Sequence, residues 1–291
     1  MWISIGLPTR VAGVSSAFVL DWARRADEGP FASLAALDRV VNRSLEPLTV
    51  LAAAVGATGR IRLMTSILLA PTRETTLLAR QAASIDALSG GRLSLGIGIG
   101  VRESDYLATG YDFHRRGRRE EEQLEVLRRL WRGEPLGEGI GPIGPAPARA
   151  GGPEVLIGGY VPAIAGRIAR WGDGFMAPGG GEPAAMAELW AVIVREWAVA
   201  GRPGRPRWVG ATYYALGADA GTAAAEYINA NYAFDPALAE RRLRTIPLGD
   251  AAVRDTIRRQ ADMGADEILL RPVAADIAQL ERLADLAAAF A

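Results

Sequence analysis

The chain has 291 residues, a formal net charge of zero from 33 basic and 33 acidic residues, and a hydrophobic content of 49%. Balanced charge gives no electrostatic reason to expect nucleic acid or an anionic membrane as a partner, and the apolar content suits a large core. The absence of cysteine and the single histidine exclude disulfides, thiolate nucleophiles and multi-histidine metal sites, so no metal site is expected.

Along the chain, short apolar runs next to Gly or Pro alternate with segments of helical spacing. The predicted strands cover residues 2–7, 31–37, 61–69, 93–99, 154–157, 173–177, 207–216 and 267–271. The predicted helices cover residues 15–27, 46–57, 72–88, 117–131, 162–171, 186–200, 222–233, 236–244, 251–263 and 276–290. Thr72 is the expected N-cap of the third helix, with Glu74 in its first turn.

Eight strands, each followed by helical sequence, predict an α/β protein with a single (β/α)8 TIM barrel domain over residues 1–291. An open doubly wound sheet is the alternative, but it has fewer strands and one glycine-rich first turn, whereas glycines here follow several strands. No apolar run of 18 residues is free of charge or glycine, and the N-terminus does not have a signal-peptide pattern. We therefore expect a soluble, cytoplasmic protein without a membrane partner.

The fourth predicted strand and the segment after it contain the first candidate site. Gly98 and Gly100 leave no side chain in the way, so a flat ligand could approach the backbone there, while Gly96 is better explained by tight packing. The arginines that follow suit an anionic ligand or a solvated helix face paired with nearby glutamates. These arginines are Arg115, Arg116, Arg118 and Arg119.

A second candidate site lies between the fifth predicted strand and its helix. Gly158, Gly159 and Tyr160 precede the helix, and free N–H groups at a helix N-terminus can bind phosphate. The alternative is a plain turn between a strand and a helix.

Six segments, taken in order, resemble the bacterial luciferase-like monooxygenase family over nearly the whole chain. They are RIRLMTSILLAPTR (60–73), ARQAASIDALSGGRLSLGIGIG (79–100), YLATGYDFHRRGRREEEQLEVLRRLWRGE (106–134), VLIGGY (155–160), ARWGDGF (169–175) and GADEILLRP (264–272). The resemblance implies the barrel and an oxidoreductase in which reduced FMN or the deazaflavin coenzyme F-420 reacts at the carboxyl ends of the strands. The residues do not distinguish the two cofactors, nor monooxygenation from hydride transfer on a small organic substrate.

The resemblance also implies roles for particular residues. It places a cis peptide bond at Ser66-Ile67 behind the isoalloxazine ring, Gly98 and Gly100 beside the ring, and the cofactor phosphate at the Gly158–Tyr160 turn. Arg116 matches an arginine that the family commonly has at its place. The resemblance further implies a homodimer and, for a flavin enzyme, a separate cofactor reductase.

Asp38 and Arg39 end the second predicted strand, where barrel enzymes place catalytic residues. Several relatives have an acidic residue followed by histidine here, so Arg39 is a departure that removes a general base. Asp38 could orient the substrate or relay a proton, and Arg39 could hold an anionic substrate or stabilise an oxyanion. The alternative is an Asp–Arg surface pair. His114 is the sole candidate for an imidazole base, although it could also be structural or solvated.

Three further expectations concern the barrel mouth. Residues 103–106 are expected to form a turn that touches the ring edge, and Tyr213 and Tyr214 to face opposite sides of the seventh strand. The Gly/Pro-rich segment 133–153 is expected to be a shortened substrate cover, which leaves the mouth open or covered by a partner subunit. The departures at residue 39 and in this segment keep open a second function class, a non-catalytic luciferase-like barrel that binds flavin weakly or not at all.

Overall fold

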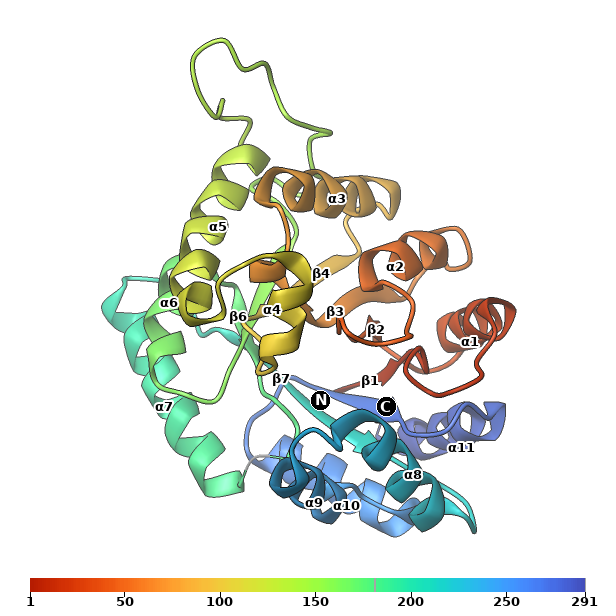
Figure 1. The fold of residues 1–291 in the computed structure, drawn as a ribbon. Coiled ribbons are helices and arrows are strands. Elements are labelled where there is room, and N and C mark those ends of the chain that lie inside the picture. Colours follow the sequence, from red (N-terminus) through yellow and green to blue (C-terminus); the bar gives the residue numbers. More distant parts are fainter. Residues whose placement is uncertain (181, 291) are drawn as a thin grey trace.

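The computed structural model describes residues 1–180 and 182–290 and forms a closed barrel of eight parallel strands in chain order, β1 to β8 (Figure 1). This confirms the predicted (β/α)8 fold and all eight predicted strands; Ala291, the last residue of the expected domain, lies outside the described residues. The strands are β1 (Trp2–Gly6), β2 (Ser33–Ala36), β3 (Arg62–Leu69), β4 (Leu93–Gly98), β5 (Glu154–Gly158), β6 (Gly174–Met176), β7 (Arg207–Tyr214) and β8 (Glu267–Pro272).

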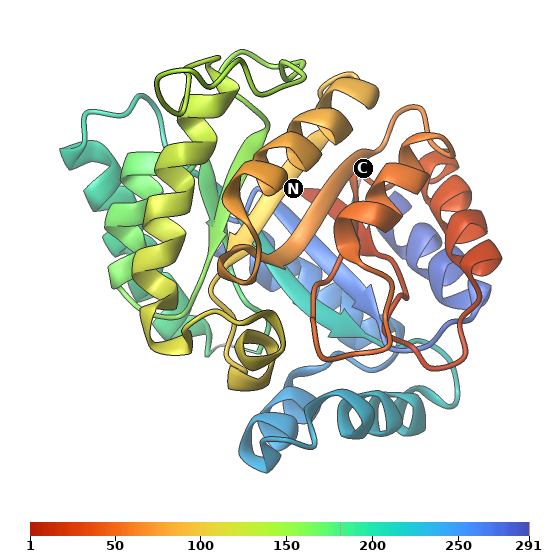
Figure 2. The same cartoon turned by 45° about the horizontal axis from the view of Figure 1, so that its top comes forward.

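Helices surround the barrel, and the strands tilt within this ring (Figures 1 and 2). The α-helices are α1 (Ser16–Glu28), α2 (Pro47–Val55), α3 (Thr75–Leu88), α4 (Glu103–Thr109), α5 (Arg116–Trp131), α6 (Ala163–Trp171), α7 (Pro183–Val199), α8 (Ala220–Tyr232), α9 (Pro236–Thr245), α10 (Gly249–Asp262) and α11 (Ile277–Ala288). Two 3₁₀ turns, η1 (Ala70–Thr72) and η2 (Phe113–Arg115), precede α3 and α5.

The alternation of side chains along each strand divides the core into two layers. Outward residues such as Leu34 and Leu63 belong to the large cluster that packs against the helices. Inward residues form a smaller apolar layer inside the barrel, which includes Met64, Leu156 and Leu269. Tyr213 and Tyr214 join different clusters, as expected for neighbouring residues of one strand.

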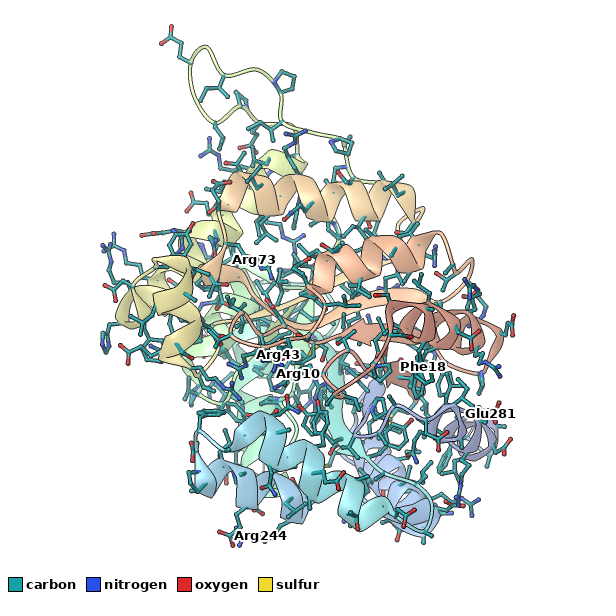
Figure 3. The ribbon with its side chains drawn as sticks, turned by 45° about the vertical axis from the view of Figure 1, so that its right-hand side comes forward. Arg10, Phe18, Arg43, Arg73, Arg244 and Glu281 are labelled. Atoms are coloured by element: carbon teal, nitrogen blue, oxygen red, sulfur yellow. The ribbon has the colours of Figure 1, made fainter. Side chains whose placement is uncertain are left out.

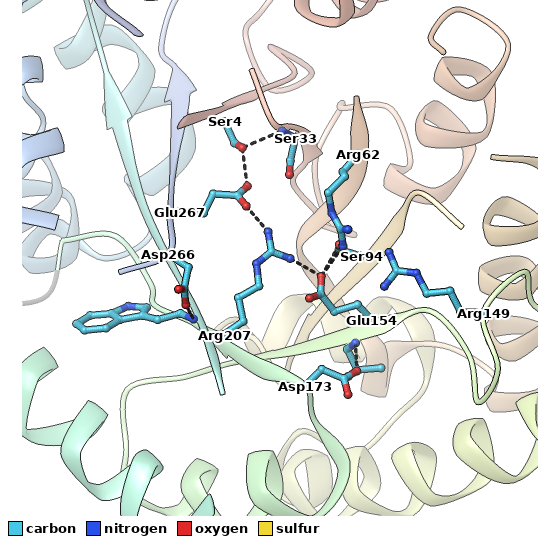
Figure 4. A network of polar contacts seen from close by, with 12 residues as sticks. Ser4, Ser33, Arg62, Ser94, Arg149, Glu154, Asp173, Arg207, Asp266 and Glu267 are labelled. Atoms are coloured by element: carbon cyan, nitrogen blue, oxygen red, sulfur yellow. Dashed lines mark hydrogen bonds and ion pairs between the residues drawn. The ribbon is translucent and has the colours of Figure 1, made fainter. Parts of the chain in front are cut away.

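A network of buried charges closes the amino-terminal end of the barrel (Figure 4). Arg207 pairs with both Glu267 and Glu154, and the Arg62 guanidinium donates to Glu154 at 2.8 Å. The Ser4 hydroxyl donates to Glu267 Oε1 at 2.5 Å. Arg62, Glu154, Arg207 and Glu267 are the first residues of β3, β5, β7 and β8, and Ser4 lies in β1. The network therefore joins the neighbours β7 and β8 and also strands that are not neighbours, such as β5 and β7.

Two local expectations from the sequence are wrong. Thr72 does not cap α3; it lies in η1, and Glu74 is the N-cap, accepting hydrogen bonds from the backbone N–H groups of Thr76 and Leu77. Residues 103–106 do not form a turn but begin α4, and Tyr106 is buried with its hydroxyl bonded to the Ile99 carbonyl. In both cases a side chain forms a hydrogen bond with a nearby backbone group, Glu74 with two N–H groups and Tyr106 with a carbonyl. The spacing of residues in the sequence did not predict these bonds.

The segment 133–153 lies at the opposite end of the barrel from the mouth, so its expected role as a shortened substrate cover is wrong (Figure 2). It connects α5 to the start of β5, and such helix-to-strand connections lie at the amino ends of the strands. Asp86 Oδ2 holds it by accepting from the backbone N–H of Ala148 at 2.9 Å, and the Arg149 side chain donates to the Gly91 carbonyl. The connection that extends over the mouth is α8–α9, between β7 and β8.

Within the described residues, none of the helices combines the length and the apolar character needed to cross a membrane.

Candidate functional site

The carboxyl ends of β3, β4 and β5 meet around a cis peptide bond at Ser66-Ile67, which confirms the expected conformation at that position. The pairing of β3 with β4 shifts register between Thr65 and Leu68, so the strand bulges there. A Cβ built at Gly98 would lie 2.1 Å from Ile67 Cδ1, and one at Gly158 would lie 3.1 Å from Ile67 Cγ2. Glycine at both positions thus lets the Ile67 side chain pack directly on the backbone of β4 and β5.

Glycine is required at three other positions of this region for a different reason at each. Gly96 has no room for a side chain, because its Cβ would lie 2.1 Å from the backbone oxygen of Thr65; this supports the packing explanation. Gly100 has a φ of +67°, a conformation that favours glycine. A Cβ at Gly159 would lie 2.7 Å from Ile164 Cγ2, so the backbone there approaches α6 closely.

The turn after β5 leads into a helix without a side-chain cap. Among the residues that the structure describes, no side chain accepts a hydrogen bond at the N-terminus of α6, whose N-cap is Pro162. Tyr160 is exposed, and its hydroxyl accepts a hydrogen bond from Arg242 Nη2 at 2.7 Å. The uncapped helix start is compatible with a phosphate ligand, whose binding stays a prediction.

Asp38 is buried, the side chain of Arg39 is only 9% exposed, and each has its own partner, so the surface-pair alternative is wrong. Asp38 Oδ2 accepts from the Leu69 backbone N–H and from Arg73 Nη2, both at 2.9 Å. Arg39 Nη1 donates to Asp105 Oδ2 at 2.6 Å, and the side chain of Asp105 is fully buried. Both side chains are therefore held in place at the mouth end of β2, next to β3 and α4.

His114 lies on the surface in η2, away from these buried pairs. Its ring packs edge-on against Phe113, with 5.7 Å between ring centroids, and its side chain makes no hydrogen bond with any described residue. The arrangement gives it neither an orienting partner nor a buried environment, the two features that prepare a histidine for general base catalysis.

The arginines that open α5 do not form one site. Arg116 turns back on its own loop, with its guanidinium 3.7 Å above the Phe113 ring and Nη1 bonded to the Phe113 carbonyl at 2.6 Å. Arg118 pairs with Glu122 on the helix surface, as the solvated-face alternative expects. Arg119 instead donates to the carbonyls of Pro71 and Arg73, and so fixes α5 to the end of β3.

The structure gathers four arginines at the mouth that the sequence analysis missed. Arg10 follows β1, Arg102 follows β4, Arg242 lies on α9 and Arg271 ends β8; none of them makes an ion pair within residues 1–180 and 182–290. Figure 3 shows Arg10 between the N-terminal part of the barrel and the α8–α9 connection. The sequence could have indicated these arginines only by their positions, because Arg10 and Arg271 lie at the carboxyl ends of the first and last predicted strands.

Two of these arginines have neighbours that define the electrostatics of the mouth. Arg271 Nη2 donates to the Ser66 carbonyl at 3.2 Å and to the Ser66 hydroxyl, which links β8 to the cis peptide bond. Burial, together with the positive charges of Arg39 and Arg10, lowers the pKa of Arg102 to about 10. The mouth is therefore a region of uncompensated positive charge.

The rim of the mouth is apolar and exposed. The loops at the carboxyl ends of β2, β4 and β5 and the α8–α9 turn expose large hydrophobic side chains, an arrangement that suits a ligand or a partner. These side chains are Val41, Leu45, Val101, Leu107, Tyr160, Val161 and Phe234.

These observations together test whether the residues fit a flavin-type cofactor. An apolar side chain, Ile67, packed on the backbone of two glycine-bearing strands suits a planar ring, and the start of α6 suits a phosphate. The positive charge of the mouth suits an anionic group of either cofactor. The residues present therefore fit such a group.

The family model for luciferase-like monooxygenases matches residues 2–290. Among curated proteins, an uncharacterised protein of Mycobacterium tuberculosis is 38% identical over 152 residues, or 50% of this chain and 52% of the relative. The F420-dependent glucose-6-phosphate dehydrogenase of Mycobacterium avium is 31% identical over 193 residues, or 61% of this chain and 53% of the relative. The matched part of the chain thus spans about half the length of these curated relatives.

Two solved structures share the fold over almost their whole length. The monooxygenase RslO1 from Streptomyces bottropensis superposes with a TM-score of 0.82 at 23% identity, covering 98% of this chain and 97% of the other. The oxygenating component of 3,6-diketocamphane monooxygenase from Pseudomonas putida, solved with FMN, has a TM-score of 0.72 at 18% identity and covers 98% and 96%. At these identities the likeness concerns the fold.

Proposed function

Because this chain belongs to the luciferase-like monooxygenase family, we propose that it is an oxidoreductase that holds reduced FMN or coenzyme F-420 at the barrel mouth and acts on a small organic substrate. The observation that carries the proposal is the close packing of the Ile67 side chain on the backbone of Gly98 and Gly158, at the carboxyl ends of β4 and β5. A family relative named for F420 and a fold relative solved with FMN support both cofactors equally.

In this proposal the ring lies against Ser66, Ile67, Gly98 and Gly100. The phosphate lies at the turn formed by residues 158–160, where the N–H groups at the start of α6 would receive it. Arg116 would have to leave the Phe113 ring to contact the cofactor, so its predicted role depends on a side-chain rotation. When bound, the reduced ring supplies the electrons for the reaction, and the protein supplies position and charge.

Of the three predicted catalytic residues, the buried pair has the better support. Arg39 can place positive charge next to a developing oxyanion while Asp105 holds its orientation, and Asp38 can orient a substrate group through its second oxygen. His114 would need a rearrangement of η2 to serve as a base.

The cofactor is tested by titrating the apo-protein with FMN and, separately, with coenzyme F-420, following tryptophan fluorescence. Micromolar or tighter binding of only one identifies the cofactor and the reaction class, oxygenation for FMN and hydride transfer for F-420. The variant Gly98→Ala, which pushes Ile67 out of its place, should weaken binding at least tenfold. Gly166→Ala on α6, where a Cβ meets open space, is the matched control and should bind as the wild type does.

Binding of neither cofactor by folded protein would favour the second candidate function, a non-catalytic barrel. The observation in its favour is that Asp38 and Arg39 are both occupied in buried pairs and that arginine stands where several relatives have histidine. A single domain over residues 1–291, a homodimer, a separate reductase and a cytoplasmic location stay predictions of the sequence and the resemblance.

A further inference from the structure

Within the described residues, a buried guanidinium without an ion-pair partner lies at the mouth, and the neighbouring Tyr232 hydroxyl raises its pKa by hydrogen bonding. Arg10 is 7% exposed, and its Nε, Nη1 and Nη2 atoms are buried with no acceptor in good hydrogen-bond geometry among the described residues. The Asn231 side chain of α8 donates to the Arg10 carbonyl at 3.5 Å, which connects the backbone at Arg10 to α8. An isolated buried charge is costly, so an arginine held in this way calls for a ligand that compensates it.

Arg10 faces a small enclosed space. A cavity of about 10 Å³ lies between the loop after β1 and the end of β8, lined among others by Gly6, Thr9, Tyr227 and Arg271. This volume holds one group of the size of a water molecule. The space therefore accommodates a single terminal oxygen of a larger ligand rather than a whole molecule.

The groups that face Arg10 do not neutralise it at neutral pH. Burial lowers the pKa of Arg10, but Tyr227, Tyr213 and Tyr232 raise it by more, so the guanidinium stays charged. Near pH 7 these tyrosines are uncharged phenols, and the Tyr213 and Tyr232 hydroxyls bond to one another at 2.7 Å. The charged residues near these tyrosines are Arg271 and Arg242, and both are positive, as Arg10 is.

We propose that Arg10 and Arg271 form a receptor for an anionic oxygen group of the substrate, so that the enzyme acts on an organic acid anion or a phosphate ester rather than on a neutral compound. This inference rests on the proposed function, since it names the substrate class of the same mouth. Arg271 also holds Ser66, so the anionic group is anchored one side chain away from the surface proposed for the ring.

The position of the pair favours the substrate over the cofactor phosphate. Arg10 and Arg271 stand at the ends of β1 and β8, which are neighbours in the closed barrel, whereas the phosphate turn follows β5 on the opposite side. The Arg10–Arg271 pair and the phosphate turn thus lie on opposite sides of the surface proposed for the ring. A cofactor phosphate bound at the turn after β5 would leave Arg10 without an anionic partner.

The test is calorimetric titration of the full chain with benzoate, inorganic phosphate and the neutral analogue benzamide. We expect benzoate or phosphate to bind, benzamide not to bind, and Arg10→Met to weaken anion binding at least tenfold. Arg10→Lys, which keeps the positive charge, should lose less anion affinity than Arg10→Met does. The control Arg43→Met alters an exposed arginine, in the loop whose Asn42 side chain bonds to Asn231, and should stay within twofold of wild type.

The thermal melt of Arg10→Met separates a binding role from a structural one. Removal of an uncompensated buried charge should leave the melting temperature unchanged or raise it, while anion binding is lost. Binding of benzoate alone identifies a carboxylate substrate, and binding of phosphate alone a phosphate ester; both outcomes support the inference. It is overturned if neither anion binds to wild type, or if Arg10→Met binds the anion as well as wild type.

Titration of Arg10→Met with FMN and coenzyme F-420 separates this inference from the proposed function. Cofactor affinity within twofold of wild type supports a substrate site. Loss of cofactor binding together with anion binding would assign Arg10 to the cofactor and overturn the inference while leaving the proposed function intact. Anion binding by a wild type that binds neither cofactor would instead refute the proposed function and leave an anion receptor in a non-catalytic barrel.

Discussion

Replacing Glu120 by glutamine is expected to change how the stability of the protein depends on pH. Glu120 lies on α5, its side chain is fully buried, and its Oε2 accepts from Arg167 Nη1 on α6 at 2.8 Å. Its other oxygen has no partner among the described residues. Burial raises the pKa of Glu120 from 4.5 to about 7, although the Arg167 charge and hydrogen bond act in the opposite direction.

The size and sign of the effect follow from this shift. Below pH 4.5 the carboxyl group is protonated in both states, and as pH rises the unfolded chain loses its proton first. The free energy of unfolding therefore falls between pH 4.5 and 7, by about 3 kcal/mol in all, of which roughly 2.5 kcal/mol lies between pH 5 and 8. Glu120→Gln resembles the protonated form, so it should be more stable than the wild type at pH 8 even though it removes an ion pair.

Urea denaturation at pH 5, 6, 7 and 8 measures this difference. Few other groups interfere, because the sequence has one histidine, the exposed His114, and His114→Gln removes it. Glu121→Gln is the matched control, since Glu121 also pairs with Arg167 but is exposed. A difference between wild type and Glu120→Gln that is constant over this pH range, or that shows wild type gaining stability as pH rises, would refute the reasoning.

Three further predictions concern other parts of the barrel. Glu267→Gln should lower the free energy of unfolding by about 3–5 kcal/mol, because it leaves Arg207 poorly compensated at the closed end; unchanged urea unfolding would contradict this. Gly96→Ala should cost about 1–3 kcal/mol or more, since its Cβ meets backbone, and a melting temperature equal to that of Gly166→Ala would count against it. Deleting residues 138–148 should leave KM and cofactor affinity unchanged, because this segment lies at the far end from the mouth; a raised KM would show that it reaches the substrate.

The parts that the sequence predicted are those that local patterns encode. Each strand is a short apolar run, so all eight were found, and the cis bond at Ser66-Ile67 followed from the family resemblance. The position of segment 133–153 could have been predicted from the elements on either side of it, a helix and then a strand. A connection from a helix to a strand lies at the amino-terminal end of the barrel. Its expected role as a substrate cover came from the resemblance rather than from this order.

The missed features depend on contacts between residues far apart in the chain. Arg10 is a single charged residue after a strand, and nothing near it in sequence shows that its side chain will be buried beside Tyr227 and Arg271. Arg39 finds Asp105 across 66 residues, and Arg207 finds Glu154 and Glu267 across 53 and 60. These residues meet only because the barrel closes, and a short sequence pattern does not predict which distant residues that closure brings together.

The unpaired arginines of the mouth have a kinetic consequence. The chain as a whole carries no net charge, but Arg10, Arg102, Arg242 and Arg271 of the mouth make no ion pair with a described residue, so the local potential at the mouth is positive. This local potential attracts anions toward the mouth over distances of about 10 Å at ordinary salt concentrations. The association rate of an anionic ligand should therefore fall as salt is added, as it does for strongly charged proteins, although this protein is neutral.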